Sequence, residues 1–199
     1  MNTPGERRLA LMYGIFHVVI RDLINTQFSP QVWQKILDSG HFDDGDFLSI
    51  KNYEDGLTDR LITTAVQVIG TTHERFLEKL GIFFIAEFST DLRDALTLGS
   101  RPGFQVSLLN LPGYIRTVIK AFPGLSVADF TAHQVDNNTF RVVYRSQRRG
   151  MAPLVRGLIL GLARLYDEKV VLSASELQIS PEVNESSYVV VLSQGDDIE

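Results

Sequence analysis

The hydrophobic pattern of the chain changes near residue 130, and this change limits the folds that the chain can adopt. Before it, apolar residues recur at the three- and four-residue spacing of helices with one buried face, as Met12, Phe16 and Val19 do within residues 9–27. After it, short segments alternate apolar and polar residues with the period of a strand. A helical part followed by a strand-rich part predicts an α+β fold.

Local signals predict where several helices of the first part begin and end. Ser29 before Pro30 is typical of a helix start, and Gly40 is expected to end that helix. Thr58 is expected to cap a third helix. A further short helix is predicted at residues 90–98.

Residues 103–121 are also helical in pattern, but Pro112 interrupts them. Proline lacks a backbone N–H and its ring clashes with the preceding turn of a helix. We therefore expect two pieces here, or a helix that begins near Pro112.

The last third predicts two strands, a helix and two more strands. The turn residues Asp136, Asn137 and Asn138 indicate a hairpin between the first two strands. The segments in chain order are 130–135, 139–147, a helix at 153–166, and strands near 170–173 and 188–192. We expect the helical first two-thirds to pack on a small antiparallel sheet with one inserted helix. Two glycines of that helix, Gly157 and Gly161, are expected to allow close packing.

Length and composition limit the number of domains, the kinds of site and the classes of partner that this chain can have. The chain has 199 residues, which suits one domain over 1–199: an N-terminal extension at 1–11, a mainly helical part at 12–125 and a sheet-containing part at 126–199. It has no cysteine, which excludes disulfides, thiolate catalysis and cysteine-based metal sites. The net charge of −5 argues against nucleic acid as a partner.

The longest apolar run, residues 80–86, is much shorter than the ~20 residues that span a bilayer. The polar first residues lack the order of a signal peptide. From the sequence we expect a cytoplasmic protein with no membrane association. We find no phosphate-binding loop and no catalytic or metal-ligand arrangement at informative spacing, so we expect no enzyme activity.

One strand carries the most specific chemical pattern. With a period of two, Phe140, Val142, Tyr144, Ser146 and Arg148 share a face, so an apolar start leads to two hydroxyls and a guanidinium. This arrangement suits carboxylates at the rim of an apolar pocket. The alternative is a solvated strand end with the arginine on the surface.

The chain resembles the haem–nitric oxide/oxygen binding (H-NOX) family, which includes the sensor domain of soluble guanylate cyclase. The resemblance runs from Met12 across nearly the whole chain. Its most specific part is the complete Tyr-x-Ser-x-Arg signature at Tyr144, Ser146 and Arg148. The other matching segments are Met12-Tyr13-Gly14, Val32-Trp33, Leu80-Gly81-Ile82-Phe83-Phe84, Leu98-Gly99 and Phe122-Pro123-Gly124.

The resemblance implies a haem b cofactor whose two propionates bind Tyr144, Ser146 and Arg148. It also implies an iron ligand, a histidine on the helix before the Phe-Pro-Gly turn. That position falls on Ile115, or on Gly113 or Tyr114 if the alignment slips, and the sequence has no histidine between His73 and His133. The family's usual sensing mechanism cannot run unchanged without this imidazole.

Two residues are candidates to replace the histidine. Tyr114 can be considered because phenolate ligates haem iron in some proteins. Its alternative is an ordinary core or rim tyrosine. His17 lies on the first predicted helix beside Phe16, where a distal-side residue could come near a porphyrin, and its alternative is a satisfied or half-exposed helix histidine. The remaining histidines, His41, His73 and His133, are interpreted as surface residues.

Where some oxygen-binding members of the family have a tyrosine, this chain has Pro153 and Leu154. If gas binds, the resemblance therefore favours nitric oxide over stable oxygen carriage. A sensor of this kind needs a signalling partner, by family analogy a histidine kinase or a cyclic-nucleotide enzyme. The alternative is a haem-free interaction or dimerisation module, compatible with a homo-oligomer, that binds another apolar carboxylate in the same pocket.

Overall fold

The computed structural model describes residues 11–43, 47, 52–87, 103–121, 129–180 and 183–193. Its Cα positions form two compact units. Of the described residues, the first unit contains those up to His73, and the second contains those from Glu74 onward. Each unit is described by itself below.

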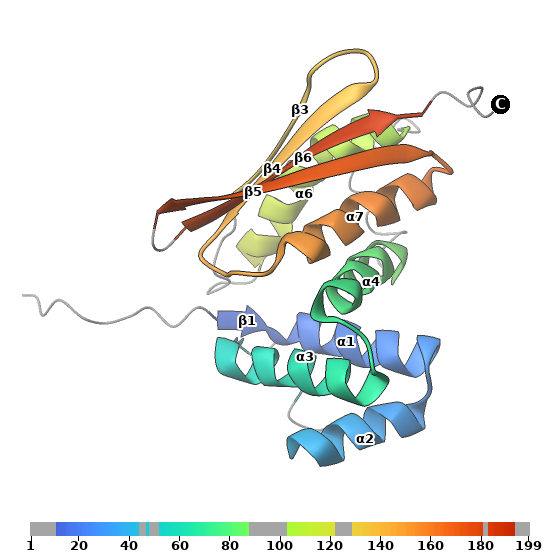
Figure 1. Ribbon diagram of the computed structural model, residues 1–199, viewed down its shortest axis with the longest axis vertical. Helices are drawn as coiled ribbons and strands as arrows, with labels where there is room; N and C mark the ends of the chain where they lie inside the picture. The colour runs from blue at the N-terminus through green and yellow to red at the C-terminus, as the bar shows by residue number, and fades with distance from the viewer. Residues whose placement is uncertain are drawn as a thin grey trace, which may run out of the picture. The chain divides into compact units, whose positions relative to one another are not determined.

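The first unit is helical, with one short pair of strands. Its elements are β1 (Leu11–Tyr13), α1 (Gly14–Gln27), α2 (Pro30–Gly40), β2 (Asn52–Glu54) and α3 (Asp55–Ile69), drawn from blue to cyan in Figure 1. The strands β1 and β2 pair antiparallel. Apolar side chains of the three helices form its core, including Ile20, Leu23, Ile24, Ile36, Leu61 and Ala65.

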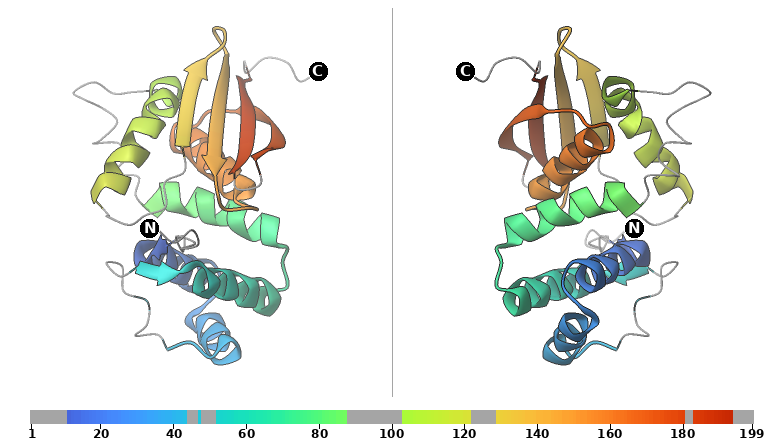
Figure 2. Two further views of the ribbon diagram at one scale, coloured as in Figure 1. Left: turned by 90° about the vertical axis from the view of Figure 1, so that its left-hand side faces the viewer. Right: turned by 90° about the vertical axis from the view of Figure 1, so that its right-hand side faces the viewer.

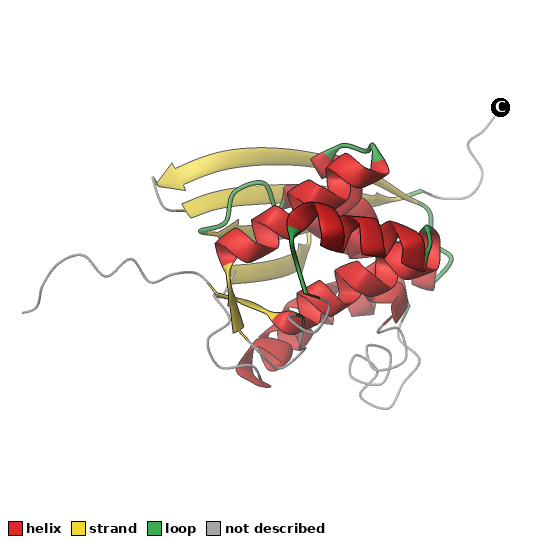
Figure 3. Cartoon of the chain, turned by 90° about the horizontal axis from the view of Figure 1, so that it is seen from below, coloured by secondary structure: helices red, strands yellow, loops and turns green. Residues whose placement is uncertain are grey.

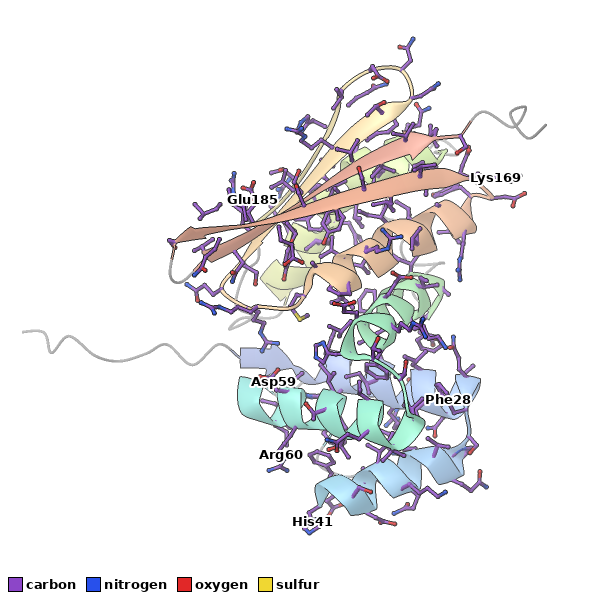
Figure 4. The ribbon with its side chains drawn as sticks, in the orientation of Figure 1. Phe28, His41, Asp59, Arg60, Lys169 and Glu185 are labelled. Carbon is purple, nitrogen blue, oxygen red and sulfur yellow. The ribbon has the colours of Figure 1, made fainter. Side chains whose placement is uncertain are left out.

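Helix α2 begins and ends where the sequence predicts. The Ser29 hydroxyl accepts a hydrogen bond from the Val32 backbone N–H at 3.3 Å, which satisfies one of the free donors of the first turn. After Gly40 the chain turns through His41, whose φ of 54° lies in the left-handed region. Arg60, which Figure 4 labels, packs on the residue after this turn: its guanidinium lies 4.9 Å from the centre of the Phe42 ring.

The predicted cap at Thr58 is wrong. Helix α3 begins at Asp55, so Thr58 lies inside the helix and is fully buried. Its hydroxyl is hydrogen-bonded to Nε2 of His17, at 2.8 Å. A buried hydroxyl needs a partner, and here the partner comes from a helix 41 residues away along the chain, which local sequence cannot reveal.

The second unit combines a four-stranded sheet with three helices. Its helices are α4 (His73–Glu87), α6 (Phe104–Ala121) and α7 (Ala152–Leu165). Its strands are β3 (Asp129–Gln134), β4 (Thr139–Ser146), β5 (Val170–Ser180) and β6 (Val183–Leu192). The strand order is β3-β4-β6-β5, and every neighbouring pair is antiparallel. The predicted α+β class is confirmed.

The hairpin of β3 and β4 forms as predicted. An Asp136 carboxylate oxygen accepts hydrogen bonds from the backbone N–H groups of Asn138, at 3.0 Å, and Thr139, at 2.9 Å. The last two strands are longer than predicted and run from Val170 to Ser180 and from Val183 to Leu192. The first half of β6 is almost entirely polar, which hides the strand, whereas the second half of β5 alternates Leu177 and Ile179 with polar residues, a signal that the sequence interpretation did not use.

Helices α6 and α7 lie on one face of this sheet, which the side view of Figure 2 and the view of Figure 3 both show. The inner face of β4 and β6 contributes Phe140, Val142, Tyr188 and Val190 to the core. The helices contribute a larger apolar set, Phe104, Leu108, Leu111, Val155, Ile159 and Leu162. Burial of such side chains stabilises a fold by roughly 1.5–3 kcal/mol each.

The expected break at Pro112 is also wrong, because α6 is continuous from Phe104 to Ala121 with Pro112 inside it. Interior proline costs a helix about 3 kcal/mol. Buried Phe104, Leu108 and Leu111 anchor the turns before the proline in the core of the second unit, and this burial offsets the cost. The predicted helix at residues 90–98 lies outside the described residues.

None of the described helices is both long enough and apolar enough to cross a bilayer.

Glycines let α4 and α7 approach closely, as predicted for Gly157 and Gly161. A Cβ atom at Gly157 would lie 3.0 Å from the Gly81 Cα and would collide with the Glu78 carbonyl oxygen. A Cβ atom at Gly81 would in turn collide with the Leu154 carbonyl oxygen. The crossing therefore has no room for side chains at these positions.

We expect Gly157→Ala to destabilise the protein by about 1–3 kcal/mol, because the added methyl forces two helix backbones apart. Gly113→Ala is the matched control, since Gly113 lies in a helix of the same unit with no atom within 4 Å of an added Cβ. The control should be neutral or stabilising by up to about 1 kcal/mol through helix propensity. Chemical denaturation of both variants measures the difference, and equal stabilities would contradict the close crossing.

Candidate functional site

The strand β4 continues its inward face beyond the core. Phe140 and Val142 are fully buried, and with the same parity Tyr144 is half-buried and Ser146 is buried. In the neighbouring strand β6, Ser186 lies opposite Tyr144 and Asn184 lies opposite Ser146. The predicted shared face is present from Phe140 to Ser146, where β4 ends, and Arg148 lies in the turn after the strand instead of on its face.

A pocket of about 190 Å³ opens where this face ends. One wall consists of Tyr144 and the connection from β4 to α7, which contributes Arg148, Arg149 and Gly150. Met151 and Ala152 form an apolar side at the start of α7. The opposite wall comes from β5 and β6, with Glu176, Gln178, Asn184 and Ser186. All of these residues belong to the second unit.

Arg148 supplies a cation to the pocket from the turn after β4. The Ser146 hydroxyl accepts a hydrogen bond from the Arg148 backbone N–H at 3.0 Å, which holds this turn against the strand end. Burial lowers the pKa of the Arg148 guanidinium to about 10, so the side chain remains a cation at neutral pH. A desolvated guanidinium favours an anion, and it suits a carboxylate because it can form two parallel hydrogen bonds.

Tyr144 adds a phenol beside this cation. Burial raises the pKa of Tyr144, and a hydrogen bond with the Ser146 side chain acts in the opposite direction. Its ring packs edge-on against Phe130, with ring centres 6.1 Å apart. The phenol is therefore protonated at neutral pH and can donate to an acceptor.

Tyr188 supports the pocket from the adjacent strand and was missed from the sequence. Its hydroxyl donates a hydrogen bond to the carbonyl oxygen of Ala152 at 2.8 Å, so the sheet is tied to the residue at the start of α7. Burial raises the pKa of Tyr188, a hydrogen bond with Ser186 lowers it, and the charge of Glu176 raises it further. The signal that could have found Tyr188 and Ser186 is the alternation along β6.

Arg145, inside the same signature, points to the other face of the sheet. Its guanidinium pairs with the Glu185 carboxylate at 2.7 Å and with Asp129 at 3.6 Å, which links β4 to the strands on both sides. Figure 4 labels Glu185 on β6. The pleat therefore separates the structural arginine from Arg148.

Helix α6 contains the positions that the sequence analysis associated with an iron ligand. Tyr114 and Ile115 are both half-buried and pack against the core cluster of the second unit. Neither belongs to the residues that line the pocket. Within the described ranges, no group of three or more His, Asp or Glu residues is placed to hold a metal ion.

His17 lies in the core of the first unit. It is fully buried, and besides its hydrogen bond to Thr58 its ring meets Tyr53 edge-on, with centres 4.7 Å apart, and Phe47 at 5.3 Å. The half-exposed interpretation is therefore wrong, because His17 is a buried helix histidine with its Nε2 hydrogen-bonded to Thr58. His41, His73 and His133 are exposed, as predicted.

Known proteins resemble this chain in sequence and in fold. The model of the Haem-NO-binding (HNOB) family matches residues 13–174. The chain belongs to the HNOB family. Soluble guanylate cyclase gcy-35 of Caenorhabditis elegans is 30% identical to this HNOB chain over 170 residues, which cover 83% of the chain and 25% of the cyclase. For gcy-31 of the same organism the identity is 26% over 174 residues, covering 84% and 24%.

Solved H-NOX structures share the fold of this HNOB chain. One, from work on the mechanism of H-NOX activation, has a TM-score of 0.80 at 16% identity and covers 92% of this chain and 97% of its own. An oxygen-binding H-NOX domain related to soluble guanylate cyclases has a TM-score of 0.78 at 15% identity, covering 92% and 96%. The HNOB chain spans about a quarter of the curated relatives.

The pKa of Tyr188 leads to a pH prediction for the HNOB chain. Above its ordinary pKa of 10.0 the unfolded phenol loses its proton while the buried phenol keeps it. The contribution of the Tyr188 phenol to the free energy of unfolding is therefore fully present below about pH 10, and it decreases as the pH rises above that value. We expect the free energy of unfolding to fall less steeply above about pH 10 in Tyr188→Phe than in the native chain.

Denaturant unfolding of both proteins at several alkaline pH values measures these slopes. Arg148 is present in both proteins and contributes equally to each slope. The lost hydrogen bond to Ala152 changes stability by a constant amount, so it does not enter the comparison. Identical slopes would show that Tyr188 titrates normally in the folded protein.

Proposed function

We propose that this HNOB chain binds a porphyrin through its propionates and serves as a gas-sensing or signalling domain. The observation that carries the proposal is the half-buried Arg148 guanidinium beside the Tyr144 phenol in one pocket. Ser146 positions both, through the Arg148 backbone N–H and the Tyr144 side chain. The Tyr144 phenol and the Arg148 guanidinium can both donate hydrogen bonds to a carboxylate. In the resemblance to the family, Tyr144, Ser146 and Arg148 are the residues that bind the propionates.

The residues present fit a haem at its carboxylate end and not at its iron end. Helix α6 contains no histidine, and the family position falls on the aliphatic Ile115. Tyr114 is the candidate ligand on this helix, although it packs against the apolar core. We therefore propose binding by the carboxylates, with an atypical axial ligand or none from the protein.

A second candidate function follows from the same helix. Ile115 packs against the core of the second unit, where an aliphatic side chain stabilises the fold without coordination chemistry. A haem-free HNOB module that uses the pocket for another apolar carboxylate, or uses the fold for interaction or dimerisation, fits this observation. The apolar side at Met151 and Ala152 suits the body of such a ligand.

A signalling partner belongs to either candidate. The curated relatives are guanylate cyclases, so a cyclic-nucleotide enzyme is the first partner class to test, and a histidine kinase is the second. We propose a binding role and no catalysis for the residues of this chain, at a cytoplasmic location.

The decisive experiment is a titration with hemin, metal-free protoporphyrin IX and protoporphyrin IX dimethyl ester, followed by absorbance and fluorescence. We expect the two free acids to bind with similar affinity and the ester, which lacks carboxylates, to bind at least about tenfold more weakly. Equal binding of acid and ester would contradict the carboxylate role of the pocket. Hemin that binds much more tightly than the metal-free acid would instead reveal an iron ligand in the protein.

Arg148→Gln should weaken binding of both free acids by about tenfold or more, since a hydrogen bond to a charged group contributes roughly 1.5–3 kcal/mol. Arg141→Gln is the matched control, because Arg141 is exposed and points to the opposite face of the same strand. The control should bind like the native chain. If neither porphyrin binds the native chain, the haem-free module becomes the supported function.

Nitric oxide added to the reduced, hemin-loaded protein tests sensing separately. A shifted Soret band would support a gas sensor, and Tyr114→Phe would then test the axial candidate. A retained band that nitric oxide does not shift would leave haem binding intact and remove the sensing role.

A further inference from the structure

Within the described part of the chain, strand β5 forms an edge of the four-stranded sheet and pairs with no strand on its outer side. It is the last strand in the order β3-β4-β6-β5 and runs for 11 residues. Figure 2 shows it at the margin of the sheet opposite β3. Protein edge strands are commonly protected from pairing by lysine, proline or short length. From Val170 to Ser180 there is no lysine and no proline, and Glu176 is the one charged residue.

The backbone hydrogen bonds show which groups of β5 point outward. The backbone N–H of Ser193 donates to the carbonyl oxygen of Lys169 at 2.9 Å, so Lys169 and the odd-numbered residues up to 177 face β6. Figure 4 labels Lys169 at the start of this strand. Leu172, Ala174 and Glu176 therefore direct their N–H and C=O groups away from the sheet.

A side chain of α7 supports this assignment. An Arg156 guanidinium nitrogen donates to the Leu172 carbonyl oxygen at 3.4 Å, from the outer side of the strand. The same guanidinium pairs with the Glu78 carboxylate at 2.8 Å. The Arg156 guanidinium therefore lies at this edge, next to the Leu172 carbonyl oxygen.

The open edge also exposes apolar side chains. Val171 is 60% exposed and Leu177 is 65% exposed. They share the face of the sheet away from α7, because their register partners, Val191 and Glu185, lie there. Exposed large apolar residues on an edge strand that has no lysine and no proline are typical of a surface that pairs with another strand.

We propose that β5 pairs antiparallel with β5 of a second copy of this chain, about a two-fold axis at Ala174. The two four-stranded sheets then form one continuous sheet. In this register Val171 lies opposite Leu177 of the second copy, and Leu177 lies opposite its Val171. The most exposed apolar residues of the strand cover each other twice by symmetry.

The proposed register uses the outward backbone groups. Residue 174 faces residue 174 of the second copy as a hydrogen-bonded pair, and Leu172 likewise faces Glu176. The Leu172 carbonyl oxygen, which already accepts from Arg156, has a second lone pair for the Glu176 backbone N–H. Val171 and Leu177 then form non-hydrogen-bonded pairs, in which opposite side chains are closest. The smallest side chain near the middle of the strand, that of Ala174, lies at the axis.

Charge complementarity selects a second copy as the occupant. Glu176 lies opposite Leu172 of the second copy, and Arg156 contacts the Leu172 carbonyl oxygen. Each Glu176 carboxylate is therefore brought next to an Arg156 guanidinium of the other copy. A contact of one strand per copy is smaller than the ~800 Å² per partner of a stable complex, so we expect micromolar self-association.

Sedimentation velocity over a range of protein concentrations tests the association. We expect a concentration-dependent dimer that Leu177→Lys weakens at least tenfold, because two cations are placed among apolar side chains. Val135→Lys is the matched control, since Val135 is 58% exposed but lies outside β5, and it should dimerise like the native chain. Circular dichroism confirms that both variants are folded. A chain that remains monomeric up to about millimolar concentration overturns the proposal.

Cross-linking tests the register directly, because the chain contains no cysteine. In a hydrogen-bonded pair the Cα atoms are about 5.5 Å apart, which a disulfide can span. Under mild oxidation, Ala174→Cys should therefore form a covalent dimer, and Ser175→Cys should do so much more slowly. Faster cross-linking at residue 175, or a native-like dimer in Leu177→Lys, overturns the proposed pairing.

Discussion

The antiparallel register between β4 and β6 is the constraint on which the second unit depends. It places Phe140 and Val142 in the core, and with the same parity it places Tyr144 in the wall of the pocket and buries Ser146. A shift of one residue would turn Arg145 and its neighbours of odd number into the core. The core and the candidate site are therefore maintained by the same pairing, and neither can change without the other.

The helical layer positions the other side of the pocket. Because Gly157 and Gly81 have no side chains, α7 packs directly against the backbone of α4. The hydroxyl of Tyr188 then binds the carbonyl oxygen of Ala152 and ties the start of α7 to the sheet. Pocket geometry thus depends on a backbone contact and on one buried hydrogen bond, both distant in sequence from Arg148.

The chain combines a conventional HNOB signature with an unconventional helix. The residues proposed to bind carboxylates come from β4 and the turn after it, whereas the position that the family resemblance assigns to the iron ligand lies on α6, where the residue is Ile115. Different elements therefore supply these two parts. Ile115 contributes to the apolar packing of the second unit, which gives the helix a structural role without coordination.

The sequence by itself determined the features that depend on neighbours within a turn or a pleat: the Ser29 cap, the Asp136 hairpin and the shared face of β4. Only the tertiary structure decided the continuity of α6 through Pro112, because long-range burial outweighs a local penalty. It also decided the role of Thr58 and the second pocket wall, which includes Glu176, Asn184 and Ser186. The physical reason is that such contacts join residues tens of positions apart, and spacing along the chain carries no record of them.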